Sequence, residues 1–172
     1  MTERLIVITG GARSGKSTKA LSLAAPYAEK LFVATAQGLD DEMRERINLH
    51  RAGRGEEWNT VEEPLDLASA MRVQPEAVAV VDCITLWLAN AMAAEIDVGS
   101  ALDDFLAAAS RRHAPVIIVT NEVGLGIVPA FESGRRFRDL AGAANQRLAA
   151  AADTVWLMVS GLGMRFMTIL SW

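Results

Sequence analysis

The sequence has one cysteine, two histidines and no uninterrupted apolar run of membrane-spanning length. The single cysteine, Cys83, excludes a disulfide framework and a cysteine-based metal site, and it fits a reducing compartment. The most apolar stretch, residues 77–94, is interrupted by Asp82 and Asn90, so it falls short of the roughly 20 apolar residues that span a bilayer. The charged N-terminus precedes only a short apolar run, which does not match an export signal. We therefore expect a soluble, cytoplasmic protein without a membrane span.

An excess of positive charge is also missing. The net charge is −4 and the isoelectric point is about 5.2, so the chain has no overall basic field that would attract nucleic acid. The length of 172 residues, of which 51% are hydrophobic, suits one compact domain with a sizeable core. We therefore predict a single domain over residues 1–172 and no nucleic-acid partner.

The N-terminal part of the chain contains an anion-binding motif. The apolar run of residues 5–8 leads into Gly10-Gly11-Ala12-Arg13-Ser14-Gly15-Lys16-Ser17, and a helical pattern follows. Glycines at this spacing let successive backbone N–H groups turn toward one point, at which the N-terminus of the following helix is also aimed. We expect Lys16 to neutralise the β- and γ-phosphates, and the Ser17 hydroxyl to coordinate Mg²⁺. The motif therefore predicts a P-loop, and the single domain over residues 1–172 is expected to be a P-loop nucleotide-binding domain.

Short apolar strands alternate with helical segments along the rest of the chain. The strands are continuous in apolar residues, which indicates that both of their faces are buried. The predicted strands are 5–8, 31–35, 78–81, 116–120 and 155–159, with an antiparallel edge strand at 165–170. The predicted helices are 19–27, 40–51, 65–72, 86–94, 102–112 and 137–152. This order predicts an α/β fold: a P-loop NTPase-like, mostly parallel sheet with helices on both faces, whose ligands bind at the carboxyl ends of the strands.

Polar residues end two of the predicted strands. Asp82 follows residues 78–81, where P-loop proteins place a carboxylate beside Mg²⁺, so we interpret it as the Walker B acid. The alternative is that Asp82 caps the helix that begins near Thr85. Asn121 and Glu122 follow residues 116–120, and they either bind substrate or only terminate the strand and cap the turn.

Only two histidines, His50 and His113, are available as catalysts. His113 lies at a predicted helix end, where a positive charge complements the helix dipole, so it needs no catalytic role. His50 shares one helix face with Met43 and Ile47, which predicts that it points inward. An inward histidine is more often a core residue than a catalyst. Beside the arginines around it, however, His50 could attack an α-phosphate and carry a nucleotidyl group as a phosphoramidate, and spacing leaves both interpretations open.

Together these motifs resemble those of the bifunctional adenosylcobinamide kinase/adenosylcobinamide-phosphate guanylyltransferases of cobalamin biosynthesis. The resemblance covers nearly the whole chain, and the order and spacing of its blocks make it specific. The blocks are residues 7–17, 34–36, 40–43, Arg46-Ile47, His50-Arg51, 58–64, 82–87, 120–129, 137–142 and 145–149. The C-terminal residues 161–172 depart from the family, because they are longer and more apolar than its short basic tail.

The resemblance implies an enzyme that phosphorylates the aminopropanol hydroxyl of adenosylcobinamide with ATP or GTP. It then transfers GMP from GTP, through a guanylylated histidine, to adenosylcobinamide phosphate, giving adenosylcobinamide-GDP and pyrophosphate. The resemblance implies that His50 is this histidine, that Lys16 and Asp82 are also catalytic, and that Ser17 and Asp82 bind Mg²⁺. The implied nucleotide contacts are Gly10, Gly11, Ala12, Arg13, Ser14, Gly15, Lys16, Ser17, Thr35, Ala36, Gln37, Arg51, Ala52, Gly53, Arg54, Glu62 and Asp82. The resemblance also implies a homo-oligomer, expected to be a homotrimer with active sites near the subunit boundaries.

Two other functions fit the P-loop. A small-molecule kinase would move only a γ-phosphoryl group and would use His50 structurally. A binding module would sense GTP, and its slow turnover would not respond to a corrinoid. The first predicts no protein-bound guanylate and no pyrophosphate release, so both alternatives can be separated from the bifunctional enzyme by experiment.

Overall fold

The computed structural model describes residues 3–38 and 41–167, which form strands and helices in near alternation. The strands are β1 (Leu5–Gly10), β2 (Lys30–Ala34), β3 (Trp58–Glu62), β4 (Val78–Asp82), β5 (Val116–Val119), β6 (Thr154–Val159) and β7 (Leu162–Met167). The helices are α1 (Lys16–Ala24), α2 (Asp41–Ala52), α3 (Leu67–Ala70), α4 (Ile84–Ala93), α5 (Val98–Ser110) and α6 (Glu132–Ala151).

All seven strands belong to one sheet, in the order β3-β2-β4-β5-β1-β6-β7. Every neighbouring pair is parallel except β6 and β7, which are antiparallel. The predicted antiparallel edge strand is therefore confirmed, although it begins at Leu162 instead of residue 165. It begins earlier because Ser160 (φ 51°) and Gly161 (φ 83°) form a two-residue hairpin turn, which fixes the register of the two strands. The predicted residues 168–170 of this strand lie outside the described part of the chain.

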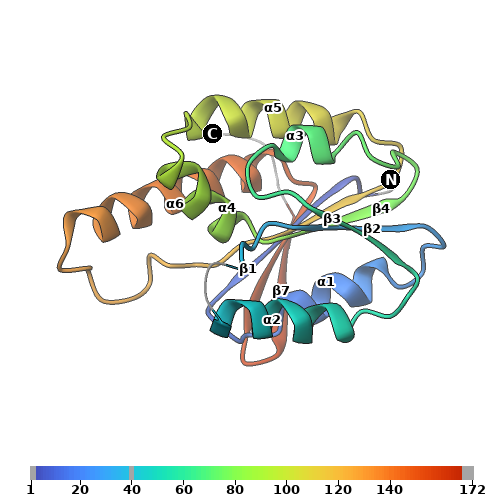
Figure 1. Cartoon of the computed structure of the whole chain (residues 1–172), viewed down its shortest axis with the longest axis horizontal. Helices are drawn as coiled ribbons and strands as arrows, with labels where there is room; N and C mark the ends of the chain where they lie inside the picture. Colours follow the sequence, from blue (N-terminus) through green and yellow to red (C-terminus); the bar gives the residue numbers. More distant parts are fainter. Residues whose placement is uncertain (1–2, 39–40, 168–172) are drawn as a thin grey trace.

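Helices cover both faces of the sheet, as predicted (Figure 1). Alternate strand residues point to opposite faces, so each of the strands β1 to β6 contributes to two separate cores. One core contains Val7, Val33 and Val81 and is covered by α3, α4, α5 and α6. The other contains Ile8 and Val80 and is covered by α1. The α/β class and the P-loop NTPase-like arrangement are thus confirmed.

The strand β3 was not predicted. Its sequence, Trp-Asn-Thr-Val-Glu, mixes polar and apolar residues without a continuous apolar run, and it lies at the edge of the sheet beside β2. Trp58 packs edge-on against Phe32 of β2, with 5.9 Å between ring centroids. An edge strand needs no continuous apolar run because it is only partly covered, so a search for such runs passes over it.

A buried arginine joins α5 to the connection between α3 and β4. Arg112 is 1% exposed, and its guanidinium donates hydrogen bonds to the carbonyl oxygens of Met71, Val73, Gln74 and Ala77, at 2.6–2.9 Å. Burial lowers the pKa of Arg112. This one side chain therefore supplies the hydrogen-bond donors for four backbone carbonyl oxygens in a connection that has no regular structure of its own.

The longest helix, α6, has 20 residues, but charged side chains recur along it. Across residues 3–38 and 41–167, none of the helices combines the length and the apolar character needed to cross a bilayer.

Candidate nucleotide-binding site

The predicted site residues converge on the carboxyl edge of the sheet. Register places Glu62, Ala34, Asp82, Val119 and Ile8 in one row across β3, β2, β4, β5 and β1. The P-loop continues from β1 at one point of this row, and residues 35–37 continue from β2 at another. Segments that lie far apart in the sequence are therefore brought to the same edge, which is where ligands bind in open α/β sheets.

Two glycines shape the P-loop. Gly10 has a φ of +146°, and a Cβ there would lie 2.3 Å from the carbonyl oxygen of Met158, so only glycine fits beside β6. Gly15 has a φ of +95° and immediately precedes α1, which begins at Lys16. The helix therefore starts three residues earlier than predicted, directly from the loop, and its N-terminus faces the site.

Lys16 lies inside the loop, with only 7% of its surface exposed. Its Nζ donates to the carbonyl oxygen of Gly11 and lies 3.4 Å from the Oγ of Ser14. Burial lowers the pKa of Lys16, while Cys83 and Asp82 act in the opposite direction. The ammonium is therefore held by the loop itself, at the position where the phosphates of a nucleotide would be neutralised.

Ser17 and Asp82 are in direct contact. The Ser17 hydroxyl donates a 2.7 Å hydrogen bond to Oδ2 of Asp82. Asp82 does not cap α4, because Cys83 occupies the N-cap position and no side chain caps that helix. The geometry therefore favours the Walker B interpretation over the capping one.

These two side chains supply oxygen donors of the kind that Mg²⁺ prefers. Within the described ranges there is no cluster of three or more histidine, cysteine, aspartate or glutamate side chains that would form a metal cage. A hydroxyl and one carboxylate fit a Mg²⁺ that completes its coordination with phosphate oxygens and water, as in other P-loop proteins.

Thr35 has a structural task next to Asp82. Its side chain is fully buried; its hydroxyl donates to the carbonyl oxygen of Cys83 and accepts from the Cys83 N–H, both at 2.8 Å. Asn90 of α4 donates to the Thr35 carbonyl oxygen. Thr35 therefore fixes the end of β4 with its side chain, and the half-buried Ala36 and Gln37 continue from it along the edge.

Cys83 is buried as well, at 6% exposed. Burial, with a contribution from Asp82, raises the pKa of its thiol to about 11. The thiol is therefore neutral at physiological pH and does not act as a nucleophile there.

The end of α2 and the turn that follows it also reach this edge. Arg51 lies 3.2 Å from the carboxylate of Glu62, so two predicted nucleotide contacts pair with each other at the surface. Arg54 is only 8% exposed, and its guanidinium lies 3.6 Å from the ring centroid of Phe32. Burial lowers the pKa of Arg54, and attraction to Asp82 opposes that shift, so Arg54 lies within electrostatic reach of Asp82. Its Nε is buried and has no hydrogen-bond partner among the described residues.

The helix predicted at residues 40–51 is confirmed as α2, although residue 40 lies outside the described part of the chain. His50 lies in its last turn, but the side chains of His50 and Ala52 also lie outside the described part, so the prediction that His50 points inward stays a prediction. His113, just beyond α5, is exposed and pairs with Glu76 at the surface, which agrees with a non-catalytic position.

Sequence reasoning missed part of a polar network beside the P-loop. Thr85 accepts from both the backbone N–H and the side-chain amide of Asn121, at 2.8 and 3.1 Å. Asn145 of α6 accepts from the hydroxyl of Thr120 and donates to the Asn121 carbonyl oxygen. The sequence did carry a signal for this network, because Thr85, Thr120 and Asn121 follow the carboxyl ends of β4 and β5. The network gives Asn121 a structural role.

Glu122 is positioned by the same turn. Its N–H donates to the carbonyl oxygen of Gly10 at 3.1 Å, and its carboxylate accepts from the N–H of Gly124. The loop after β5 is therefore joined to the P-loop at its first residues.

The chain is similar in sequence and fold to several known proteins. The chain is 43% identical to the "Bifunctional adenosylcobalamin biosynthesis protein CobU" of Escherichia coli, over 94% of this chain and 98% of that one. It is 42% identical to the "Bifunctional adenosylcobalamin biosynthesis protein CobP" of Pseudomonas aeruginosa, over 92% and 94%. A crystal structure of the RadB recombinase superposes with a TM-score of 0.51 at 18% identity, over 90% of this chain and 73% of that one, which is a likeness of fold.

Residues 6–166 match the family described as "Cobinamide kinase / cobinamide phosphate guanyltransferase". This match includes every residue of the candidate site, from the P-loop to the network around Asn145. The chain therefore belongs to the cobinamide kinase / cobinamide phosphate guanyltransferase family.

Proposed function

We propose that this protein phosphorylates the aminopropanol hydroxyl of adenosylcobinamide and then transfers GMP from GTP to the phosphate so formed. The observation that carries the proposal is the constellation of Lys16, Ser17 and Asp82 at one edge of the sheet, in a chain of this family. The arginines at positions 51 and 54 approach the same edge, so one nucleotide site has both a phosphate anchor and a second cationic segment.

In the first reaction, the γ-phosphoryl group moves to the substrate hydroxyl. The hydroxyl oxygen forms a bond to the γ-phosphorus, the bond to the β,γ-bridging oxygen breaks, and the hydroxyl proton is lost to solvent or a base. Lys16 and the N–H groups at the start of α1 hold the phosphate oxygens on which negative charge develops. Ser17 and Asp82 would hold Mg²⁺, which supplies further charge neutralisation at the β- and γ-phosphates when bound.

In the second reaction, we assign His50 as the nucleophile. An imidazole nitrogen bonds to the α-phosphorus of GTP, the bond to the α,β-bridging oxygen breaks, and pyrophosphate leaves. A phosphate oxygen of the corrinoid phosphate then attacks the same phosphorus, so that the P–N bond breaks and adenosylcobinamide-GDP forms with free histidine. Arg51, in the last turn of α2, and Arg54, just after the helix, follow His50 in the sequence, and their guanidinium groups can pair with phosphate oxygens.

The assembly and compartment are part of the proposal. We expect a homotrimer in the cytoplasm, with GTP, ATP, adenosylcobinamide and its phosphate as small-molecule partners. Support for the compartment is the single buried thiol, Cys83, which suits a reducing environment.

The experiment that tests the proposal follows two labels into the corrinoid. The protein is incubated with adenosylcobinamide and Mg²⁺, and with GTP labelled at either the α- or the γ-phosphorus. We expect γ-label in the corrinoid phosphate, α-label in adenosylcobinamide-GDP, and one pyrophosphate released for each guanylyl transfer. Incorporation of γ-label without any α-label would support the single-activity kinase instead. GTP hydrolysis that does not respond to the corrinoid would support the binding module.

A further inference from the structure

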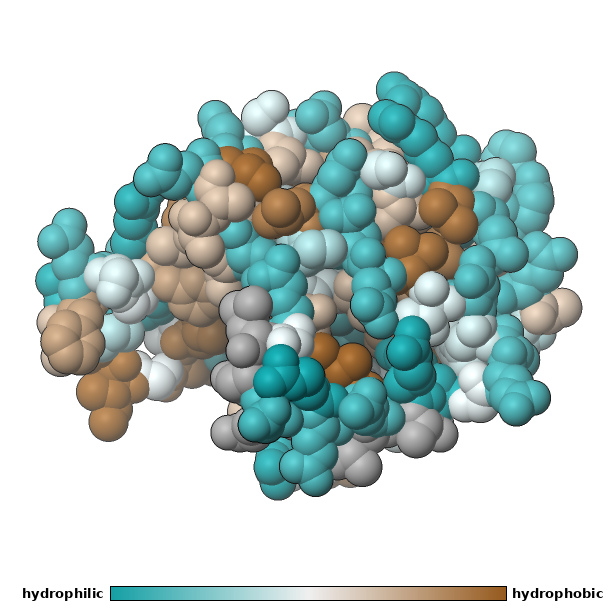
Figure 2. All heavy atoms as spheres, in the orientation of Figure 1, coloured by the Kyte–Doolittle hydropathy of each residue, from teal (hydrophilic) through white to brown (hydrophobic). Residues whose placement is uncertain are grey.

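The connection between β5 and α6 exposes four large apolar side chains. Leu125 is 86% exposed, Ile127 97%, Val128 59% and Phe131 81%. We call residues 124–131 the apolar arm. Figure 1 shows the arm in orange, extending away from the layers of the domain, and Figure 2 shows brown and tan side chains gathered at the same end. Apolar side chains grouped in this way mark a binding surface, whereas single exposed ones are ordinary.

The arm begins at the nucleotide site. Glu122, two residues before it, donates its N–H to the carbonyl oxygen of Gly10 in the P-loop. Val123 packs against the core, so the chain turns outward only after this point. A residue advances the chain by at most about 3.5 Å, so Leu125 lies within roughly 10 Å of Glu122. A ligand on the arm can therefore extend one of its substituents to the P-loop.

The arm is also held at its far end. Arg135 of α6 donates to the carbonyl oxygens of Pro129 and Ala130, at 3.1 and 2.7 Å. Pro129 packs so closely on Gly134 that a Cβ there would lie 2.8 Å from the proline ring. The backbone is anchored on both sides while the apolar side chains project into solvent. This arrangement presents the side chains for contact at little further ordering cost.

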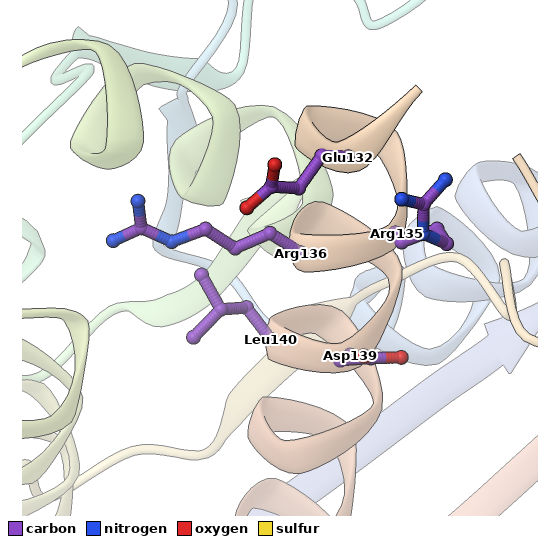
Figure 3. Close-up of a pocket in the computed structure, with 5 residues that line it drawn as sticks. All are labelled: Glu132, Arg135, Arg136, Asp139 and Leu140. Carbon is purple, nitrogen blue, oxygen red and sulfur yellow. The ribbon is translucent and has the colours of Figure 1, made fainter. Parts of the chain in front are cut away.

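A hollow adjoins the arm along the first turns of α6. Its volume is about 510 Å³, within the usual range of ligand sites. It is lined by Glu132, Arg135, Arg136, Asp139 and Leu140 (Figure 3). Figure 3 shows Glu132, Arg136 and Leu140 pointing to the same side of the helix, so an acceptor, a donor and an apolar side chain are offered together.

We propose that the apolar arm and the adjoining hollow bind the corrinoid ring of the acceptor substrate. A corrinoid is a broad, flat macrocycle with methyl groups on its faces and amide groups along its edges. Leu125 and Ile127 match the apolar faces, while Glu132 and Arg136 match the N–H and C=O groups of the amides. The inference rests on the proposed function, because it assigns the acceptor of that same site.

The test replaces apolar contacts on the arm without touching the nucleotide site. The double variant Leu125→Ser/Ile127→Ser is compared with Ala107→Ser, which adds a hydroxyl at an exposed position of α5, outside the arm and the hollow. We expect the double variant to raise the KM for cobinamide by about tenfold or more and to leave the KM for GTP unchanged. The control variant should match the wild type, and all three proteins should sediment alike.

An unchanged KM for cobinamide in the double variant would overturn the proposal. A rise accompanied by a lower sedimentation coefficient would also overturn it, because the arm would then contact a second copy of the chain. If the wild type does not turn over cobinamide at all, the proposed function fails separately. Equilibrium dialysis of cobinamide then decides the inference, since equal dissociation constants for wild type and double variant would exclude binding on the arm.

Discussion

Individual side chains at the carboxyl edge of the sheet have tasks that their positions in the sequence leave ambiguous. Asp82 was interpreted either as a Mg²⁺ ligand or as a helix cap, and its 2.7 Å hydrogen bond with the Ser17 hydroxyl favours the role of Mg²⁺ ligand. Thr35 was predicted to contact the nucleotide, but its hydroxyl makes two hydrogen bonds with the backbone of Cys83. The P-loop could be predicted because its conformation depends on local glycine spacing. The tasks of Thr35 and Asn121 could not, because they depend on which strands are neighbours.

Asp82 should be needed for Mg²⁺-dependent turnover. Replacing it by asparagine removes the negative charge that would hold Mg²⁺ beside Ser17, so we expect Asp82→Asn to lower kcat for both reactions by about 100-fold or more. The half-saturating Mg²⁺ concentration should rise as well. Steady-state assays over a Mg²⁺ titration measure both quantities. The exposed Asp104→Asn serves as the matched control, and equal Mg²⁺ curves for the two variants would contradict a metal role for Asp82.

The stability of the protein should depend on pH through Cys83. Burial raises the pKa of its thiol to about 11. The unfolded thiol has an ordinary pKa near 9, so between pH 9 and pH 11 it ionises in the unfolded chain while it stays neutral in the folded one. The stabilising contribution is therefore fully present below pH 9 and is lost as the pH rises to about 11. We expect the free energy of unfolding to fall by about 2 kcal/mol more in the wild type than in Cys83→Ala over this interval.

Urea denaturation at several pH values measures that difference, because other groups titrate in both proteins and cancel. Parallel pH profiles for wild type and Cys83→Ala would show that the thiol ionises equally in both states. Cys83 would then have to be accessible to solvent in the folded protein.

Secondary-structure elements were predictable where their pattern is strong. The buried strands read as continuous apolar runs, and α2 and α6 showed clear helical patterns. The edge strand β3 was missed because its short, mostly polar sequence resembles a loop when its neighbour β2 is unknown. The connection between α3 and β4 has no regular pattern either, and its conformation depends on one distant side chain, Arg112.

The hydrogen bonds of Arg112 should contribute measurably to the stability of the fold. Arg112→Met keeps much of the volume but leaves several buried carbonyl oxygens without a donor, so we expect a loss of about 3 kcal/mol in the free energy of unfolding. Chemical denaturation measures it. The neighbouring Arg111 is exposed, and Arg111→Met should change stability by less than about 0.5 kcal/mol. Similar losses in the two variants would mean that the four hydrogen bonds contribute little.

At the scale of the whole molecule, the class of fold could be predicted but the order of its strands could not. Alternating strands and helices imply a layered α/β sheet, whereas the order β3-β2-β4-β5-β1-β6-β7 depends on how distant segments pack. The outer surface carries apolar groups beyond the arm. Val159, Leu162, Met164 and Phe166 are each more than half exposed on the β6–β7 hairpin at the edge of the sheet.

We expect this hairpin to form the contact between the subunits of the proposed trimer. A threefold assembly needs a patch on one copy to meet a different patch on the next. We expect sedimentation equilibrium to give about three times the chain mass of 18.5 kDa, and Met164→Lys/Phe166→Lys to lower it, because charge on the hairpin opposes apolar contact. A wild-type mass of 18.5 kDa would contradict the trimer. An unchanged mass in the variant would exclude the hairpin as the contact.

The two reactions proposed for one site differ in whether the protein carries the nucleotide covalently, so the most direct measurement is protein-bound label. Wild type, His50→Ala and His113→Ala are incubated with α-labelled GTP and Mg²⁺, and acid-labile radioactivity on the protein is counted. The expected result is label on wild type and on His113→Ala, none on His50→Ala, and γ-phosphoryl transfer to cobinamide retained in all three. Label that persists on His50→Ala, or that never forms on the wild type, would contradict guanylyl transfer through His50.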